Sequence, residues 1–313
     1  MEHFNAVLNQ VIIFMMIMVV GFIVFKVRAL PESVLPAISI FFTKVVVTAI
    51  IFFNTVNGAT REEMISTFFL TGIVAVTYAV LICITRSLPK ILKLTGDRAK
   101  IFPITFTFGN VGFIGIPLLL TVFGQRAMVF VNMFAVVDLI TFWTYGYSQT
   151  FPAGHKFKLS VSTFKKMLNP PLIAIVLSVV LIFLGVRMPR IVNNALETVA
   201  NAGMALPFIY VGGMIATMTD SSLFKRFEIY IGILIKMLIF PILIFIIMTA
   251  LNIDREIAIA TSILFGLPTM AVVPMLAGAN GSDEKYTTFI VLVTTIASLF
   301  TLTFVTYMVS VVL

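Results

Sequence analysis

The sequence has few charged residues, two histidines and a single cysteine. Only 11% of its 313 residues are charged, whereas an ordinary soluble domain is about 25% charged. So few charges cannot cover a soluble protein of this size, which excludes a soluble enzyme and a nucleic-acid-binding protein. One cysteine, Cys83, excludes an internal disulfide framework. His3 and His155 are not spaced as metal ligands and no phosphate-binding G-x-x-x-x-G-K-[ST] motif occurs, so we expect no metal and no cofactor.

Hydrophobic residues make up 60% of the chain, which contains 31 phenylalanines and 17 methionines. A membrane-spanning helix needs about 20 predominantly apolar residues. The period-two alternation of a membrane β-barrel is absent. We therefore predict an all-α integral membrane protein in a lipid bilayer, with ten spans at about 6–25, 34–56, 64–85, 99–123, 127–148, 169–186, 194–218, 229–250, 255–279 and 286–312.

The distribution of basic residues predicts the orientation of these spans. Loops that follow odd-numbered spans contain 14 lysines and arginines, and loops that follow even-numbered spans contain 5. Cytoplasmic loops carry the excess of basic residues. We therefore expect the odd-numbered loops in the cytoplasm and both termini outside it, in a multi-pass protein of the cell membrane. The net charge of +8 is thus interpreted as a topology signal.

The fourth and ninth spans share a spaced pattern of glycine and proline. Each has a glycine, a proline eight residues later and a glycine seven residues after that, at Gly109, Pro117 and Gly124 and at Gly266, Pro274 and Gly281. The offset is 157 residues in all three cases, half the chain length. Five spans per half is an odd number, so the second half would enter the membrane inverted. We predict two inverted repeats, 1–150 and 169–313, with a cytoplasmic linker over 151–168.

Proline and glycine in mid-span interrupt a helix, and the released backbone groups cannot face lipid. The N-terminus of the second half-helix then offers N–H groups and partial positive charge to an anion. Asn110 lies in the first interruption and can donate from its side-chain amide. The candidate substrate-binding residues are Asn110, Gly109, Gly112, Gly115, Pro117, Pro268, Thr269, Pro274 and Lys44.

Three charged residues, Lys44, Asp138 and Lys236, lie away from the ends of their predicted spans, where charges usually face a cavity or a partner. Lys44 is the candidate to complement a carboxylate or to pair with Asp138. Asp138 is a candidate to carry a proton or cation, unless the two form a structural pair. We expect Lys236 to extend to the cytoplasmic surface. The asparagines at positions 54, 132 and 201 are expected to form interhelical hydrogen bonds.

The segment Gly109–Leu118 resembles the fourth-span motif of the auxin efflux carrier family, and Leu267–Pro274 resembles its ninth span. The short 151–168 linker favours the bacterial malate- and malonate-type permeases. The resemblance implies a fold similar to bile-acid symporters and sodium/proton antiporters. Spans 1, 2, 6 and 7 would form a scaffold, spans 3–5 and 8–10 a transport domain that moves like an elevator, and two copies a homodimer.

The resemblance matches Asn110 to the family's substrate-carboxylate ligand, and matches Pro117 and either Pro268 or Pro274 to its crossover prolines. We therefore expect a secondary transporter for a small organic anion, a mono- or dicarboxylate such as malate or malonate. The alternative is a membrane ligand sensor or channel for organic anions. A membrane-embedded enzyme is disfavoured because Asp138 is the one acid near the middle of a predicted span, and the predicted spans contain no histidine.

Overall fold

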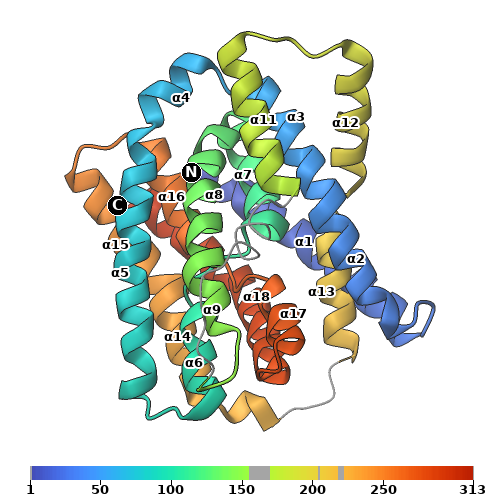
Figure 1. Cartoon of the computed structure of the whole chain (residues 1–313), viewed down its shortest axis with the longest axis vertical. Coiled ribbons are helices and arrows are strands. Elements are labelled where there is room, and N and C mark those ends of the chain that lie inside the picture. The colour runs from blue at the N-terminus through green and yellow to red at the C-terminus, as the bar shows by residue number, and fades with distance from the viewer. Residues whose placement is uncertain (1, 155–169, 204, 218–221, 313) are drawn as a thin grey trace.

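The computed structural model describes residues 2–154, 170–203, 205–217 and 222–312. These residues form helices, many of them roughly parallel, and contain no β-strand (Figure 1). In this described part of the chain, seven helices are long and apolar enough to cross a membrane, and the shorter Pro170–Leu184 is also apolar. Most of the predicted linker 151–168 lies outside the described residues.

The helices of the first half follow the predicted spans, several as shorter consecutive pieces. In chain order they are α1 (Glu2–Lys26), η1 (Glu32–Val34), α2 (Leu35–Phe41), η2 (Phe42–Val46), α3 (Val47–Gly58), α4 (Arg61–Thr67), α5 (Phe69–Ile91), α6 (Gly96–Thr105), η3 (Val111–Gly115), α7 (Ile116–Phe123), η4 (Gly124–Arg126), α8 (Ala127–Thr141), η5 (Phe142–Gly146) and α9 (Tyr147–Gln149).

The second half is divided in a similar way. Its helices are α11 (Pro170–Leu184), α12 (Arg190–Gly203), α13 (Leu206–Thr217), η6 (Ser222–Lys225), α14 (Phe227–Ile233), η7 (Leu234–Ile239), α15 (Phe240–Ala250), α16 (Arg255–Phe265), α17 (Val272–Ala279), α18 (Glu284–Tyr307) and η8 (Met308–Val312). The segments η2, η3, η5, η7 and η8 are π-helical turns within or at the end of longer helices. Such turns are frequent at functional sites.

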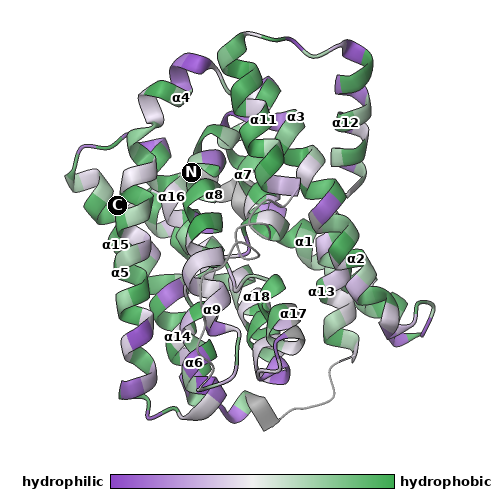
Figure 2. Cartoon of the chain, viewed as in Figure 1, coloured by the Kyte–Doolittle hydropathy of each residue, from purple (hydrophilic) through white to green (hydrophobic). Residues whose placement is uncertain are grey.

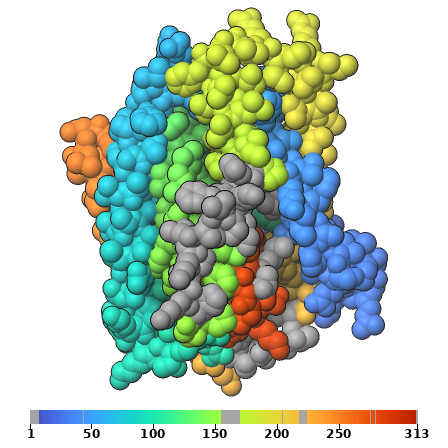
Figure 3. Space-filling view, in the orientation of Figure 1, coloured from blue at the N-terminus to red at the C-terminus, as the bar shows by residue number. Residues whose placement is uncertain are grey.

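Hydropathy separates the middles of the helices from their ends. In Figure 2, hydrophobic colour runs along α5 and α11, and hydrophilic colour gathers on α4 and the lower end of α5. The helices pack side by side, with α5 along one edge of the view and α2 along the other (Figure 3). Large apolar side chains such as Phe68, Val76 and Ile191 are exposed. A lipid environment accounts for this surface, since soluble monomers rarely expose large apolar patches.

The closest helix packing joins α1 to α13. A Cβ built on Gly21 would lie 2.4 Å from the backbone oxygen of Ile209, and one built on Gly212 would lie 2.0 Å from that of Met18. Small residues allow membrane helices to approach until their backbones touch. The two glycines therefore set the distance between these helices, and the rings of Phe14 and Phe208 stack beside them.

The other contacts divide into two groups. Helix α3 packs on α11 and α12, in the same group as α1 and α13. Helix α5 packs on α6 and α8, while α15 packs on α16 and α17 on α18. Contacts of α1 with α7 and α18, and of α3 with α8, join the groups. The first group lies in the predicted scaffold spans and the second in the predicted transport spans.

A turn at Ala205, which the sequence patterns did not predict, lies just before α13. Helix α12 ends at Gly203 and α13 begins at Leu206, within the predicted span 194–218. A Cβ on Gly203 would meet the side chain of Val46 at 2.1 Å. Close packing on η2 therefore requires glycine here, and Pro207 at the start of α13 cannot continue the helix before it.

The glycine contact between α1 and α13 yields a stability prediction. Gly212→Ala places a methyl group against the α1 backbone, so we expect the unfolding free energy to fall by about 1–3 kcal/mol. The control is Gly72→Ala on α5, where an added Cβ meets nothing within 4 Å; it should be neutral or stabilising. Thermal unfolding of the purified protein in detergent compares the two. Equal midpoints for both variants would contradict the packing described here.

Candidate functional site

Two interruptions face one another in the middle of the fold. The first covers the residues between Thr105, where α6 ends, and Val111, where η3 begins. The second lies between Phe265 and Val272, the end of α16 and the start of α17. Pro268 lies in the second interruption. Pro117 and Pro274 lie past the interruptions, inside the second half-helices, within α7 and α17.

The two interruptions are hydrogen-bonded to each other. Gly109 and Thr269 form an antiparallel bridge. The N–H of Asn110 donates to the carbonyl of Pro268 at 2.8 Å, and the N–H of Met270 donates to that of Phe108 at 3.1 Å. Each gap therefore supplies partners for backbone groups that the other gap releases, as burial away from water requires.

Side chains add further bonds to this crossing. The hydroxyl of Thr269 donates to the carbonyl of Thr105, the last residue of α6, at 2.6 Å. Its backbone N–H donates to the hydroxyl of Thr294 on α18 at 3.1 Å. Thr269 therefore ties α6, the second gap and α18 together, and its position makes it a structural residue of the crossing.

Glycine is required where the two half-helices approach. A Cβ on Gly109 would lie 3.1 Å from the Cβ of Leu267 and 3.2 Å from the carbonyl oxygen of Leu264. A Cβ on Gly115 would lie 2.7 Å from a methyl group of Leu267. Gly112 differs, because its nearest neighbours are the Val47 methyl groups at 3.7 Å, an ordinary contact. Gly109 and Gly115 thus serve the crossing, and Gly112 faces a space.

The crossing changes one expectation about anion binding. The glycine–proline pattern predicts exposed backbone amides at the gaps, but the backbone N–H of Asn110 is bonded to Pro268, so it is not available to a ligand. The side-chain amide of Asn110 remains available. Asn110 is only 2% exposed, and its Nδ2 atom has no hydrogen-bond partner within the described part of the chain. A buried amide without a partner is costly and needs an explanation.

Asn110 lines a cavity of about 470 Å³ beside the crossing. The size is within the range of small-molecule sites. Its walls come from α3, η3, α8, η5, α11 and the second gap. The lining residues are Lys44, Val47, Ile51, Asn110, Val111, Gly112, Phe113, Ile116, Ala135, Asp138, Leu139, Phe142, Trp143, Pro170, Pro171, Ile175, Met270, Ala271 and Val272. Most of this surface is apolar, and Lys44, Asn110 and Asp138 are its polar groups.

Asp138 and Lys44 share the cavity but are not an ion pair. Among the described residues no ion pair within 4 Å joins them. The carboxylate of Asp138 instead accepts a hydrogen bond from the hydroxyl of Tyr78 on α5. Both of these side chains are buried, whereas Lys44 is exposed. The cationic head of Lys44 is thus not neutralised by Asp138 in this structure.

Lys236 approaches Asp138 from the other side of the crossing. We expected its side chain to extend to the surface, and this is wrong, because the residue is 0% exposed. Its ammonium donates to the carbonyl of Leu267 in the second gap. It lies close enough to Asp138 to favour the carboxylate form, although no ion pair within 4 Å joins the two among the described residues. The partial negative charge at the C-terminus of α16 favours a cation at this position. Hydropathy alone could not distinguish this contact from an extended lysine.

The asparagines within the predicted spans gave mixed outcomes. Asn132 on α8 forms the predicted interhelical bond, donating to the hydroxyl of Thr55 on α3 at 2.9 Å. Asn54 instead donates to Ile50 of its own helix, so its interhelical prediction is wrong. Asn201 lies on an exposed part of α12.

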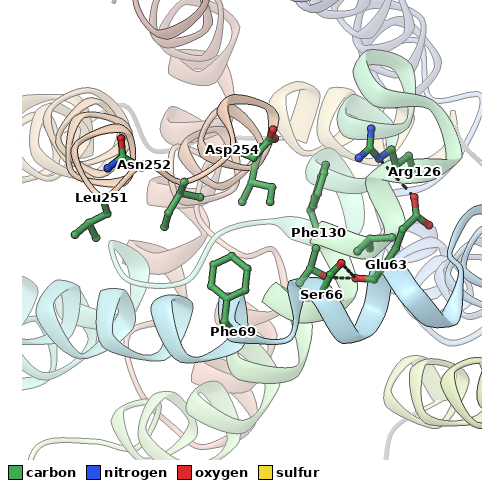
Figure 4. A pocket seen from close by; sticks show the side chains of 12 residues that line it. Glu63, Ser66, Phe69, Arg126, Phe130, Leu251, Asn252 and Asp254 are labelled. Carbon is green, nitrogen blue, oxygen red and sulfur yellow. Dashed lines mark hydrogen bonds and ion pairs between the residues drawn. The ribbon is translucent and has the colours of Figure 1, made fainter.

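A second pocket of about 460 Å³ lies near the starts of α4, α8 and α16. Figure 4 shows Glu63 and Arg126 joined on one side, with Leu251 and Asn252 away on the other. The Arg126 guanidinium lies 3.7 Å from the carboxylate of Glu63 and 3.3 Å from that of Glu256. Two carboxylates already neutralise this cation, so the pocket offers a carboxylate ligand little attraction.

The structure thus brings four of the ten predicted site residues into one cavity: Lys44, Asn110, Gly112 and Asp138. Pro268, Thr269, Gly109 and Gly115 contribute to the crossing behind it. The aromatic wall formed by Phe113, Phe142 and Trp143, and the hydroxyl of Tyr78, were not predicted. Such residues are common in apolar spans, and no spacing rule distinguishes the ones that face a cavity.

These features define a multi-pass membrane protein built around two crossed, interrupted helices with a cavity beside them. The model of the membrane transport protein family matches residues 6–306. The chain therefore belongs to this family of transporters, the auxin efflux carrier family, which confirms the resemblance of the fourth-span motif. No curated protein matches the chain.

The buried charges yield a prediction that distinguishes Lys236 from Lys44 as the lysine whose charge is coupled to Asp138. Asp138→Ala removes the nearby negative charge from the buried Lys236 ammonium and the acceptor from the Tyr78 hydroxyl, so we expect the unfolding free energy to fall by about 1–3 kcal/mol. Asp138→Ala combined with Lys236→Met should recover much of this loss. The control combines Asp138→Ala with Lys44→Met, and its effects should be additive. Thermal unfolding in detergent measures the stability of all variants. Additive effects of Asp138→Ala and Lys236→Met, with non-additive effects of Asp138→Ala and Lys44→Met, would contradict the structure.

Proposed function

We propose that the protein is a secondary transporter that moves a small organic carboxylate across the membrane. The observation that carries this proposal is the buried Asn110 amide, which lacks a protein partner and lines a cavity next to the crossing. Gly112 and Phe113 lie in the first turn of the following half-helix, where N–H groups have no intrahelical acceptor. Amide donors and a helix N-terminus together suit a carboxylate.

The cavity walls favour a monocarboxylate with an apolar body among the mono- and dicarboxylates considered. Lys44 supplies the positive charge and Asn110 the directed hydrogen bond, while Phe113, Trp143 and Ile175 line the rest. A second carboxylate, as in malate or malonate, would be desolvated among these apolar side chains and near the negative charge of Asp138. Burying an unpaired charge is strongly unfavourable.

Alternating access by an elevator-like movement is part of the proposal. The two packing groups support a scaffold from the α1, α2, α3, α11, α12 and α13 segments and a transport domain from the remaining helices. The 5+5 inverted repeat, a homodimer through the scaffold, and a cell-membrane location with both termini outside the cytoplasm complete the proposed organisation. Asp138, bonded to Tyr78 and attracted to Lys236, is the proposed group for coupling to a proton or cation.

Counterflow in proteoliposomes distinguishes this function from a ligand sensor or a channel. A carrier exchanges internal for external carboxylate with saturation, a sensor binds without flux, and a channel does not accumulate label against trapped unlabelled substrate. We expect saturable counterflow of a labelled aryl or alkyl monocarboxylate. Absence of exchange with any carboxylate, despite binding, would favour the sensor.

The same assay tests Asn110. Asn110→Ala removes the side-chain amide but keeps the backbone N–H that bonds to Pro268, so the crossing should remain folded. Losing a hydrogen bond to a charged group should reduce uptake at subsaturating substrate by about tenfold to a hundredfold. The control is Asn194→Ala on the exposed face of α12, which should transport normally. Unimpaired uptake by Asn110→Ala would remove Asn110 from the site.

Competition assays on Lys44 variants test whether the substrate is a monocarboxylate or a dicarboxylate. We expect phenylacetate or hexanoate to compete for uptake more strongly than malate or malonate, since the cavity holds one free cation among its described lining residues. Lys44→Met should raise the half-inhibitory concentration of the monocarboxylate by about tenfold, whereas Lys44→Arg keeps the charge and should have a smaller effect. A preference for malate that Lys44→Met leaves unchanged would contradict this assignment.

A further inference from the structure

The 157-residue offset of the glycine and proline pattern extends to the walls of two cavities. Beside the main cavity, a second small pocket lies among α1, η3, α7, α13 and α18. Six residues of the main cavity each have a counterpart 157 positions away that lines this pocket. The pairs are Ile51 and Phe208, Asp138 and Thr295, Phe142 and Leu299, Pro171 and Phe14, Ile175 and Met18, and Ala271 and Ile114.

The two matched spaces differ in size. The main cavity has a volume of about 470 Å³ and its counterpart about 10 Å³. A single water needs roughly 10–15 Å³, so the counterpart is closed to any organic ligand. The matched positions therefore enclose an open space on one side of the crossing and a closed one on the other.

Two aromatic rings close the counterpart. Phe14 of α1 and Phe208 of α13 stack with ring centroids 3.7 Å apart and an angle of 17° between the planes. Both rings are buried, together with Met18. The corresponding residues of the open cavity are Pro171 and Ile51, which present no pair of rings. The stacked rings of Phe14 and Phe208 thus account for the smaller volume of the closed pocket.

The closed pocket lies between a second opening and the crossing. A space of about 410 Å³ shares Phe14 with the closed pocket and is also lined by Gln10, Thr121 and Asn201. Asn201 is the counterpart of Lys44, again at an offset of 157 residues. On its inner side, the closed pocket reaches Ile114 of η3, which lies between Phe113 and Gly115 in the half-helix that follows Asn110.

We propose that the closed pocket is the second access path, through which the carboxylate reaches or leaves the same Asn110 site from the opposite side of the membrane when Phe14 and Phe208 separate. This inference rests on the proposed transport function. Lys44 and Asp138 of the open path correspond to Asn201 and Thr295 in the second path, so the second path is the neutral one. Rearrangement of the α1–α13 face against α7 and α18 opens it.

Thiol labelling tests the second path, because the chain has one cysteine. In a Cys83→Ser background, Ala135→Cys places a thiol in the open cavity and Ser298→Cys places one in the closed pocket. Without substrate, a membrane-impermeant methanethiosulfonate should label Ala135→Cys readily and Ser298→Cys slowly. Adding Phe14→Ala should raise the labelling rate of Ser298→Cys by about tenfold or more and leave that of Ala135→Cys unchanged, which also verifies folding. Phe208→Leu is the second opening variant.

Labelling in proteoliposomes shows from which face of the membrane each thiol is reached. During counterflow, the impermeant reagent should label Ser298→Cys from the face opposite to the one from which it labels Ala135→Cys. If counterflow proceeds while Ser298→Cys stays unlabelled, with Phe14 intact or substituted, the second path is wrong and the transport function stands. If Ser298→Cys is labelled with Phe14→Ala but no carboxylate is exchanged, the path exists and the transport function fails.

Discussion

A helix interrupted at membrane depth releases backbone donors and acceptors that lipid cannot satisfy, and this constraint organises the structure. The two gaps are bonded to each other, through the Gly109–Thr269 bridge and the bonds of Asn110 to Pro268 and Met270 to Phe108. Neither gap could exist without the other at this depth. The glycines at 109 and 115 follow from the same constraint, because the crossing brings both against Leu267.

Mutual pairing also determines what remains for a ligand. Once the backbone amide of Asn110 is bonded, the unpartnered group is its side chain, directed at a mostly apolar cavity. Lys236 is held behind the crossing at Leu267, and Asp138 is held by Tyr78. The cavity therefore presents one amide and the cation of Lys44 to a carboxylate, while the buried charges stabilise the arrangement around it.

Composition and the positions of glycine and proline predicted the helical membrane class, the two interruptions and the position of Asn110 in the first of them. These features follow from local sequence, since Gly109 and Gly266 lie at the two interruptions, although Pro117 and Pro274 lie inside α7 and α17. The positions of Lys236 and the aromatic wall depend on which side of a uniformly apolar helix faces the protein, and hydropathy carries no such information. The turn at Ala205 was not predicted, although Pro207 beside it is a signal that the sequence contains.

The 157-residue offset between residues that line the main cavity and residues that line its smaller counterpart supports the proposed inverted repeat. A transporter built in this way needs one ligand site that both paths reach. A ligand-bound experimental structure tests that claim most directly. We expect density for a monocarboxylate in the main cavity, with its carboxylate within hydrogen-bond distance of Asn110 Nδ2. Density bound at the Glu63–Arg126 pocket, with the Asn110 amide still unpartnered, would contradict it.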